Sequence, residues 1–276
     1  MFSYNFDYYR PASIREAAGL FQRLDAQGKR PMYWSGGTEI ITLGRVNLVY
    51  TEAVIDLKHI PECRALAVND QSLIVGSALT LSELYDSRVF PLLGETGSGV
   101  ADRTSRNKIT LGGNICSQFI YKEAVLPLLL TDSDLVIAGP SGARRIPIGQ
   151  IFNGTLRLGS GEFLVQSVTD SQYLTMPHFS IKKRKVAAID YPVVTTAAIR
   201  TNSGIRLAFS GLCAFPFRSA ALERLLNESK LPVAERVGLA ASQLPAPILS
   251  DMKASAAYRE IVWKNVLIDI LTTLGE

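Results

Sequence analysis

Two short segments of this 276-residue chain run an apolar stretch into a pair of glycines followed by a small polar residue. The first reads WSGGTEI and contains Ser35, Gly36, Gly37 and Thr38, and the second reads KITLGGNIC. Glycine permits positive φ and lets a ligand approach the backbone closely. Successive backbone N–H groups in such turns can converge on an anion, particularly where a helix begins behind them. Either pair alone is typical of a tight turn, but the two together raise the odds of one elongated ligand that carries phosphate.

The remaining reactive side chains exclude several other kinds of chemistry. Neither GxGxxG nor GxxxxGK[ST] occurs, so the ligand is not held as in a Rossmann or P-loop site. Cys63, Cys116 and Cys213 contain no CxxC pair, and the chain has only two histidines, His59 and His178. These residues are too few and too scattered for an iron–sulfur cluster or a zinc site. The sequence therefore predicts no metal ligand and no catalytic acid or base, and any redox chemistry must rest on an organic cofactor.

The composition predicts an ordinary globular protein with room for a large core. Hydrophobic residues make up 47% and charged residues 20% of the chain, which is far from a disordered composition. No apolar run approaches the roughly 18–20 residues that span a bilayer. The first residues also lack the basic and apolar regions of a signal peptide. With three cysteines that suit a reducing compartment, we expect a cytoplasmic protein without a membrane segment.

The chain has a mild net charge of +4, and its densest run of basic residues is KKRK at residues 182–185. Two interpretations stay open for this run: a solvated turn or strand edge, and a cationic patch that faces an anionic cofactor or a partner subunit. Binding to nucleic acid is disfavoured because no aromatic residues are interleaved with the basic ones.

Local patterns predict the elements that position the two glycine pairs. Ser13 is a plausible N-cap for a helix within residues 11–29, and residues 30–34 and 52–58 read as strands. This alternation favours a small α/β unit with parallel strands. Between about residues 71 and 170 the pattern indicates a mixed sheet with helices, including a strand over 72–80 and a hairpin over 135–148.

A third section starts near residue 172 and predicts a hairpin followed by helices. Strands over 193–201 and 205–215 are joined by Asn202, Ser203 and Gly204, a hairpin turn signal. Helices are expected over 218–228 and 231–243 and at the C-terminus. The last helix is expected to pack through Ala257, Ile261, Val262, Val266, Leu267, Ile270 and Leu271.

Several segments of the sequence resemble those of a known family. WSGGTEI and the segment from Thr104 to Ile148 resemble the FAD-binding subunit of the molybdenum hydroxylases, which include carbon monoxide dehydrogenase and xanthine dehydrogenase. YYRPAS, VIDLKHIPE, LIVGSALTLSEL and GEFLVQSV extend the similarity over most of the chain. The resemblance implies an α+β fold with a two-lobed FAD-binding domain of the p-cresol methylhydroxylase type over residues 1–171. Its lobes would span about 1–60 and 61–171, and a smaller α+β C-terminal domain would span 172–276.

The same resemblance implies where FAD binds. The segment Ser35 to Ile40 would wrap the pyrophosphate with its N–H groups and the Thr38 hydroxyl. The second segment, Thr110 to Asn114, would meet the pyrophosphate and ribityl chain from the other lobe. The expected cofactor-binding residues are Ser35, Gly36, Gly37, Thr38, Glu39, Ile40, Arg106, Thr110, Gly112, Gly113, Asn114, Glu123 and Lys182.

Two of these positions depart from the family or leave an alternative open. The family places an aspartate nine residues after the asparagine, bonded to a ribose hydroxyl, and this chain has Glu123 there. Lys182 aligns with a family lysine near the isoalloxazine carbonyls, where its charge would favour the reduced flavin; the alternative is a surface lysine. The family arginine that follows is replaced by Val186. Phe119 and Tyr121 either stack near the adenine or pack internally.

Flavin proteins of this fold can attach FAD through His or Cys, so His59 and Cys116 need an assignment. We expect His59 to be structural and Cys116 to be a small buried thiol, which leaves FAD non-covalently bound.

The implied function is electron transfer within a heteromeric xanthine dehydrogenase-like enzyme. Electrons would come from [2Fe–2S] clusters of an iron–sulfur partner subunit and leave FAD for NAD or another acceptor. A molybdenum-binding partner subunit with molybdopterin would hydroxylate the substrate, for example a purine or another N-heterocycle. The alternatives are a stand-alone FAD-dependent oxidoreductase of the same fold and a scaffold subunit without cofactor.

Overall fold

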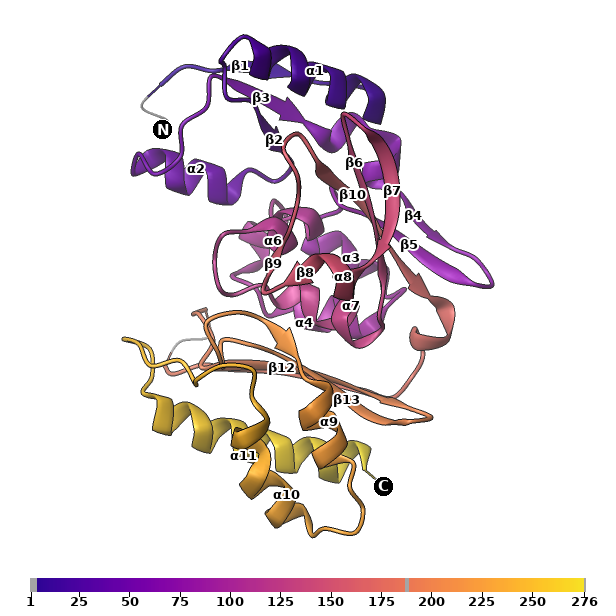
Figure 1. The fold of residues 1–276 in the computed structure, drawn as a ribbon, viewed down its shortest axis with the longest axis vertical. Coiled ribbons are helices and arrows are strands. Elements are labelled where there is room, and N and C mark those ends of the chain that lie inside the picture. The colour runs from indigo at the N-terminus through magenta and orange to yellow at the C-terminus, as the bar shows by residue number, and fades with distance from the viewer. Residues whose placement is uncertain (1–3, 187–188, 276) are drawn as a thin grey trace. The chain divides into compact units, whose positions relative to one another are not determined.

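The computed structural model describes residues 4–186 and 189–275, which form two compact units whose segments alternate along the sequence. Unit 1 contains the chain up to Leu84 together with Arg103–Ser117 and Asp132–Ser171. Unit 2 contains Tyr85–Asp102, Gln118–Thr131 and the chain from Gln172 onward. Figure 1 follows the elements of each unit along the chain. The functional division into residues 1–171 and 172–276 stays a prediction.

Unit 1 begins with the parallel sheet that the sequence predicted. Its strands β1 (Asp7–Tyr9), β3 (Ala53–Asp56) and β2 (Met32–Trp34) lie in that order, and both pairings are parallel. Helix α1 (Ile14–Ala26) connects β1 to β2, and helix α2 (Thr38–Arg45) leads from β2 towards β3. Ser13 is confirmed as the N-cap of α1, because its hydroxyl accepts the N–H of Glu16.

The second sheet of unit 1 differs from the prediction of a mixed sheet, since each of its strand pairs is antiparallel. The hairpin between β6 and β7 is confirmed, with Gly139 opposite Gly142. Strand β10 then returns between β5 and β6, so no helical crossover leads to a parallel neighbour. Strand β5 also ends at Gly76, short of the predicted Thr80. The sheet order is β4 (Leu66–Val68), β5 (Ser72–Gly76), β10 (Phe163–Asp170), β6 (Asp134–Gly139) and β7 (Gly142–Pro147).

Short elements complete unit 1, and one core joins α1 to both sheets. That core contains Leu20 and Leu24 of α1, Ile55 of β3 and Val165 of β10. Helix α3 (Leu81–Ser87) begins in unit 1 and ends in unit 2. The other elements are two 3-10 turns (Leu57–His59 and Pro61–Arg64), α5 (Arg103–Arg106), α6 (Leu111–Cys116), α8 (Ile148–Ile151), β8 (Phe152–Asn153) and β9 (Thr155–Leu156).

Unit 2 is built on one antiparallel sheet with helices. Its order is β11 (His178–Lys183), β12 (Val194–Thr201), β13 (Gly204–Ser210) and β14 (Phe217–Arg218). The predicted hairpin is confirmed, with Thr201 opposite Gly204. The helices are α4 (Pro91–Ser98), α7 (Leu126–Leu130), α9 (Ala220–Leu226), α10 (Val233–Leu239) and α11 (Ala256–Leu274), with 3-10 turns at Glu123–Val125, Ser171–Tyr173 and Ala240–Gln243.

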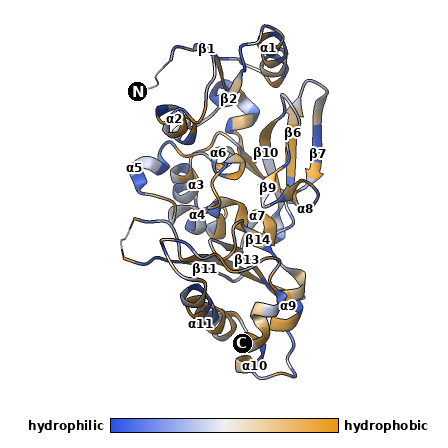
Figure 2. Cartoon of the chain, turned by 60° about the vertical axis from the view of Figure 1, so that its left-hand side comes forward, coloured by the Kyte–Doolittle hydropathy of each residue, from blue (hydrophilic) through white to orange (hydrophobic). Residues whose placement is uncertain are grey.

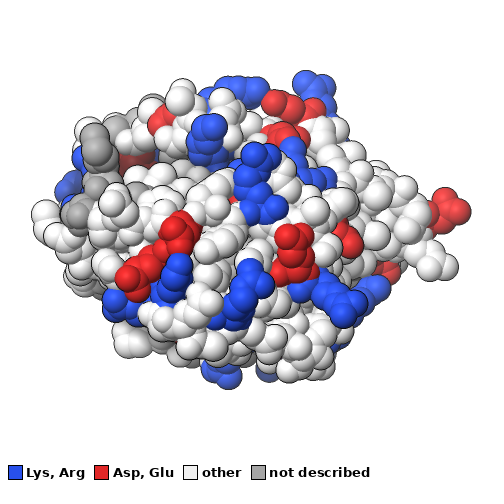
Figure 3. All heavy atoms as spheres, turned by 90° about the horizontal axis from the view of Figure 1, so that it is seen from above, with Lys and Arg blue, Asp and Glu red and all other residues white. Residues whose placement is uncertain are grey.

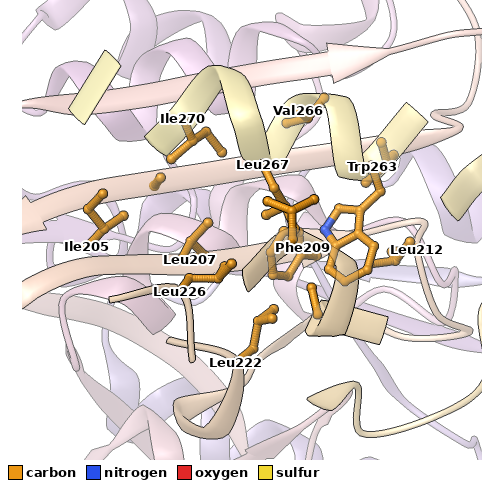
Figure 4. Packing of buried hydrophobic residues seen from close by; sticks show 14 of the residues in the cluster. Ile205, Leu207, Phe209, Leu212, Leu222, Leu226, Trp263, Val266, Leu267 and Ile270 are labelled. Carbon is orange, nitrogen blue, oxygen red and sulfur yellow. The ribbon is translucent and has the colours of Figure 1, made fainter. Parts of the chain in front are cut away.

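Helix α11 packs on the sheet of unit 2 through a face that the sequence predicted only in part. Trp263, Val266, Leu267 and Ile270 belong to the same buried cluster as Phe209 of β13 (Figure 4), and the Trp263 and Phe209 rings meet edge to face. Ala257 and Ile261 were predicted on this face and are exposed instead. The buried stripe runs from Arg259 through Trp263, and Ile261 lies on the other side of the helix. Figure 2 shows that hydrophobic and hydrophilic residues are mixed along α11.

Among the described residues, no helix is both long enough and apolar enough to cross a membrane. On the face of the molecule drawn in Figure 3, basic and acidic side chains are interspersed. That face therefore lacks a continuous basic surface of the kind that binds nucleic acid.

Candidate functional site

The first glycine turn lies at the carboxyl edge of the parallel sheet, directly after β2. Ligands of open parallel sheets bind beyond this edge. Gly37 has a φ of 71° and is the N-cap residue of α2, which no side chain caps. A Cβ on Gly37 would overlap the indole of Trp34, so both the backbone conformation and the packing require glycine here.

This turn presents hydrogen-bond donors that have no acceptor in the described parts of the chain. The N–H groups of Gly36, Gly37 and Thr38 form no hydrogen bond there, and the Ser35 hydroxyl is buried and has no partner. The N-terminus of α2 adds partial positive charge at the same place. Leaving a buried donor such as the Ser35 hydroxyl unpaired costs about 1–3 kcal/mol, so an anion that accepts from it would stabilise the turn. The donors therefore fit a phosphate-bearing group.

The second glycine turn lies beside the first within unit 1. A Cβ on Gly36 would overlap the backbone carbonyl oxygen of Lys108, and its next neighbour would be the N–H nitrogen of Thr110. Thr110 is the N-cap of α6 and begins the second turn. The structure therefore brings together the two segments that the sequence singled out.

The backbone donors of the second turn are already used inside unit 1. The N–H of Leu111 donates to the Leu79 carbonyl at 2.9 Å, and the N–H of Gly112 donates to the Ser77 carbonyl at 2.8 Å. Gly113 donates to the Thr110 hydroxyl at 3.1 Å, and the N–H of Asn114 donates to the Thr110 carbonyl. The first turn can thus donate hydrogen bonds to a ligand from its N–H groups. The second turn can offer a ligand only contact with its backbone surface.

The two glycines of the second turn differ in what surrounds them. Gly112 is buried, and a Cβ there would lie 2.7 Å from the Cβ of Ser77. Gly113 is exposed, and a Cβ there would meet only the Thr110 hydroxyl, at 2.9 Å. Gly112 therefore serves packing, and Gly113 leaves room for a ligand at the backbone. Of the other predicted residues, Arg106 ends α5 and Asn114 is buried within α6.

Glu123 and Lys182 form a buried ion pair in unit 2. Lys182 Nζ lies 2.8 Å from Glu123 Oε1, and the two side chains are 7% and 3% exposed. Lys182 also donates to the Gly99 carbonyl at 2.9 Å, as Arg184 does. The interpretation of residues 182–185 as a solvated run is therefore wrong for Lys182. Two side chains with separate predicted roles towards FAD are bonded to each other, and those roles stay predictions.

The bulky segment after the second turn makes aromatic contacts inside unit 2. The ring of Tyr121 stacks on Tyr191 with centroids 4.8 Å apart, and Phe119 lies 6.4 Å from the same ring. These contacts support the packing interpretation of both residues, although Phe119 remains partly exposed.

The two residues considered for covalent attachment have different surroundings. His59 accepts a hydrogen bond from Arg10 Nε at 2.9 Å, which supports a structural role. Cys116 is exposed, so the prediction of a buried thiol is wrong. It is the last residue of the short helix α6, where the chain leaves the core of unit 1. By contrast, burial raises the pKa of Cys63 to about 12 and that of Cys213 to about 11.

Sequence reasoning missed a polar cluster next to the first turn. Lys58 Nζ donates to the Ser35 carbonyl at 2.9 Å and to Asp56 Oδ1 at 2.8 Å. Asp56 is completely buried and also accepts from the Tyr8 hydroxyl. Burial alone would raise the pKa of Asp56, but the bonds from Lys58 and Tyr8 outweigh it and lower this pKa. The signal was the charged pair of Asp56, which ends β3, and Lys58, which follows it at the same sheet edge.

A parallel sheet with an uncapped glycine turn at its carboxyl edge, beside a second glycine turn, has donors and open backbone that fit a phosphate-bearing ligand. Residues 4–168 match the family described as the FAD binding domain in molybdopterin dehydrogenase. The chain belongs to this family, and it is a FAD-binding oxidoreductase subunit of α+β fold.

Relatives and solved structures resemble the chain over nearly its whole length. It is 27% identical over 290 residues to the xanthine dehydrogenase FAD-binding subunit of Escherichia coli O157:H7, covering 97% of both chains. It is 24% identical to the carbon monoxide dehydrogenase medium chain of Hydrogenophaga pseudoflava, covering 92% of this chain and 91% of that one. The solved carbon monoxide dehydrogenase of H. pseudoflava shares the fold with a TM-score of 0.87 at 23% identity, covering 99% and 98% of the chains. Quinoline 2-oxidoreductase of Pseudomonas putida 86 gives a TM-score of 0.85 at 21% identity, with coverage of 99% and 98%.

Proposed function

We propose that this chain is the electron-transfer flavin subunit of a xanthine dehydrogenase-like molybdenum hydroxylase. FAD, once bound, supplies redox chemistry that can couple one-electron and two-electron partners. In this proposal an iron–sulfur subunit with [2Fe–2S] clusters delivers the electrons, and NAD or another acceptor receives them. A third subunit carries molybdopterin and hydroxylates the substrate. Relatives that are named as FAD-binding or medium subunits support this assignment.

One observation carries the proposal: the unpaired donors of the first turn lie beside the open backbone of the second, in a chain of a FAD-binding family. The N–H groups of Gly36, Gly37 and Thr38 and the Thr38 hydroxyl would bind the pyrophosphate. Gly113 would let the pyrophosphate and ribityl chain lie against α6. Glu39, Ile40, Arg106 and Asn114 would complete the binding surface.

Glu123 and Lys182 keep groups for FAD even while they are bonded to each other. A lysine ammonium has three N–H donors, and Lys182 uses two of them, on Glu123 and on the Gly99 carbonyl. Glu123 bonds Lys182 through one carboxylate oxygen and retains the second. A ribose hydroxyl and a flavin carbonyl are therefore still the partners we propose for the two residues.

The metal centres belong on other subunits in this proposal. Residues 4–186 and 189–275 contain no group of three His, Cys, Asp or Glu side chains that could hold a metal ion. Burial raises the pKa of Cys63 and of Cys213, which disfavours the thiolates that bind iron. All three thiols are free, which suits the cytoplasm that we propose as the location.

The test is to purify the full chain, reconstitute it with FAD and record its visible spectrum. We expect the two visible absorption bands of oxidised flavin, and we expect acid precipitation to release the flavin because it is bound non-covalently. A colourless chain that does not bind FAD would contradict the proposal and leave the scaffold alternative. Flavin that stays with the acid precipitate would contradict only the non-covalent attachment.

A second measurement separates the subunit from a stand-alone oxidoreductase. An affinity tag on the chain, expressed with its neighbouring genes, should recover iron and molybdenum in the purified complex. The isolated FAD-loaded chain should not turn over a substrate by itself. Recovery of a monomer that catalyses a complete reaction would favour the stand-alone enzyme instead.

A further inference from the structure

Lys58 contacts the backbone of the first glycine turn, and neither the sequence nor the comparisons assign it a role. Trp34 and Asp56 are paired residues at the ends of β2 and β3, so the residues that follow them are neighbours. Lys58 therefore lies beside Ser35, and its ammonium donates to the Ser35 carbonyl oxygen at 2.9 Å.

Two other residues hold this ammonium in place. Lys58 Nζ is 2.8 Å from Asp56 Oδ1, and Asp56 also accepts the N–H of Lys58 itself at 2.9 Å. The other Asp56 oxygen accepts from the Tyr8 hydroxyl. The Asp56 side chain is completely buried, whereas the Lys58 side chain is 39% exposed. A buried carboxylate with two fixed donors leaves the ammonium little freedom.

The contact with Ser35 acts on Gly36 through the peptide bond. The Ser35 carbonyl and the Gly36 N–H belong to one planar trans peptide, so they point in opposite directions. Fixing the carbonyl on Lys58 therefore also fixes the direction of the Gly36 N–H, one of the unpaired donors of the turn. A cation on the carbonyl also polarises the peptide and makes its N–H a better donor.

We propose that Lys58 is a positioning residue for the diphosphate of a bound dinucleotide, acting through the Ser35–Gly36 peptide. This inference rests on the proposed function, since it takes FAD as the ligand. The pairing with Asp56 largely cancels the charge of Lys58 at a distance. Its effect is therefore orientation of the turn, not long-range attraction of the phosphates.

The experiment compares the full chain with three variants: Lys58→Met, Lys58→Arg and Lys29→Met. Lys29→Met is the control for the loss of an ion pair in unit 1, since Lys29 bonds Asp7 and its side chain is 35% exposed. Because Asp7 is 56% exposed and Asp56 is completely buried, the free energy of unfolding of each variant is measured alongside. FAD affinity is measured by quenching of flavin fluorescence during titration of the cofactor-free proteins. Hydrogen exchange of the peptide that contains residues 34–40 is measured in the same cofactor-free proteins.

We expect Lys58→Met to weaken FAD binding about tenfold, the scale of one hydrogen bond that involves a charged group. Lys58→Arg should recover part of the affinity, because a guanidinium can also donate to the carbonyl. Exchange of the 34–40 peptide should be faster in Lys58→Met, and Lys29→Met should match the parent in both measurements.

The outcomes separate this inference from the proposed function. If the parent binds FAD and Lys58→Met binds it equally well, the inference is overturned while the proposed function stands. Equal losses in Lys58→Met and Lys29→Met also overturn it, since they would report a general effect of charge or stability. A parent that does not bind FAD overturns both.

Discussion

At the scale of single residues, the two glycine turns are alike in sequence and different in structure. Both contain Gly-Gly followed by a polar residue, but among the described residues only the first turn leaves its backbone donors without an acceptor. The acceptors that occupy the second turn are the carbonyls of Ser77 and Leu79. These residues are distant in sequence, so no local pattern predicts them. The sequence singled out both turns, but not that their backbone N–H groups differ in whether they have acceptors inside unit 1.

Gly112 and Gly113 should therefore respond differently to the same substitution. Gly113→Val should weaken FAD binding by about tenfold to a hundredfold, equivalent to about 1–3 kcal/mol, and should cost less stability than the same change at Gly112, because the only neighbour of its Cβ among the described residues is the Thr110 hydroxyl. Gly112→Val should instead lower the free energy of unfolding by about 1–3 kcal/mol, because its side chain meets Ser77. FAD titration and urea unfolding of both variants provide the measurements. Unchanged FAD affinity in Gly113→Val would show that the second turn does not line the site.

The buried pair of Glu123 and Lys182 gives a second prediction at this scale. Lys182→Met should lower the free energy of unfolding by about 3–5 kcal/mol, because it leaves the Glu123 carboxylate buried and unpaired. The double variant with Glu123→Leu should recover most of that loss.

Urea unfolding of the cofactor-free proteins measures both effects. Lys183→Met is the control, one residue further along β11, and should stay within about 0.5 kcal/mol of the parent. Equal stability of the single and double variants would mean that the pair does not form in solution.

At the scale of elements, the structural features that depend on adjacent residues were predicted correctly. The N-cap at Ser13 and the turns at Gly139–Gly142 and Thr201–Gly204 each depend on a few neighbours in sequence. The antiparallel order of the second sheet and the buried face of α11 depend on partners far along the chain. Apolar residues lie on several sides of α11, so the face predicted from the sequence included exposed positions, and contact with the sheet of unit 2 decides which side is buried.

Helix α11 offers two isoleucines that test this orientation. Ile270 is fully buried against the unit 2 sheet, and Ile261 is 61% exposed. Ile270→Ala should cost about 2–5 kcal/mol of unfolding free energy. The same change at Ile261 should stay within about 0.5 kcal/mol. Thermal and urea unfolding compare the two, and similar losses at both positions would contradict the packing of α11.

At the scale of the whole molecule, the two compact units are each assembled from separate segments of the chain. Helices α4 and α7 precede residue 171 and yet belong to unit 2. Arg206 of β13 donates to the Leu130 carbonyl at 2.8 Å, and Arg218 of β14 donates to the Leu129 carbonyl at 3.0 Å. Apolar side chains of α7 would lose their covering without the C-terminal section.

A chain cut after Ser171 should therefore not fold by itself. We expect it to melt without a cooperative transition and to bind a dye that reports exposed apolar surface. Co-expression with residues 172–276 should restore a soluble, cooperatively melting assembly. Cooperative melting of the 1–171 fragment alone would show instead that this segment is an independent domain.

The indole of Trp34 lies against Gly37, so its intrinsic fluorescence can report on the first glycine turn. The chain has two tryptophans, and each lies in a different unit: Trp34 beside the first glycine turn and Trp263 in the buried core of unit 2. A Trp263→Phe variant leaves only the emission from Trp34, which a flavin bound at the adjacent turn would quench. A Trp34→Phe variant leaves only the emission of the other unit. Cofactor capture and the unfolding of each unit can thus be followed separately without an added label.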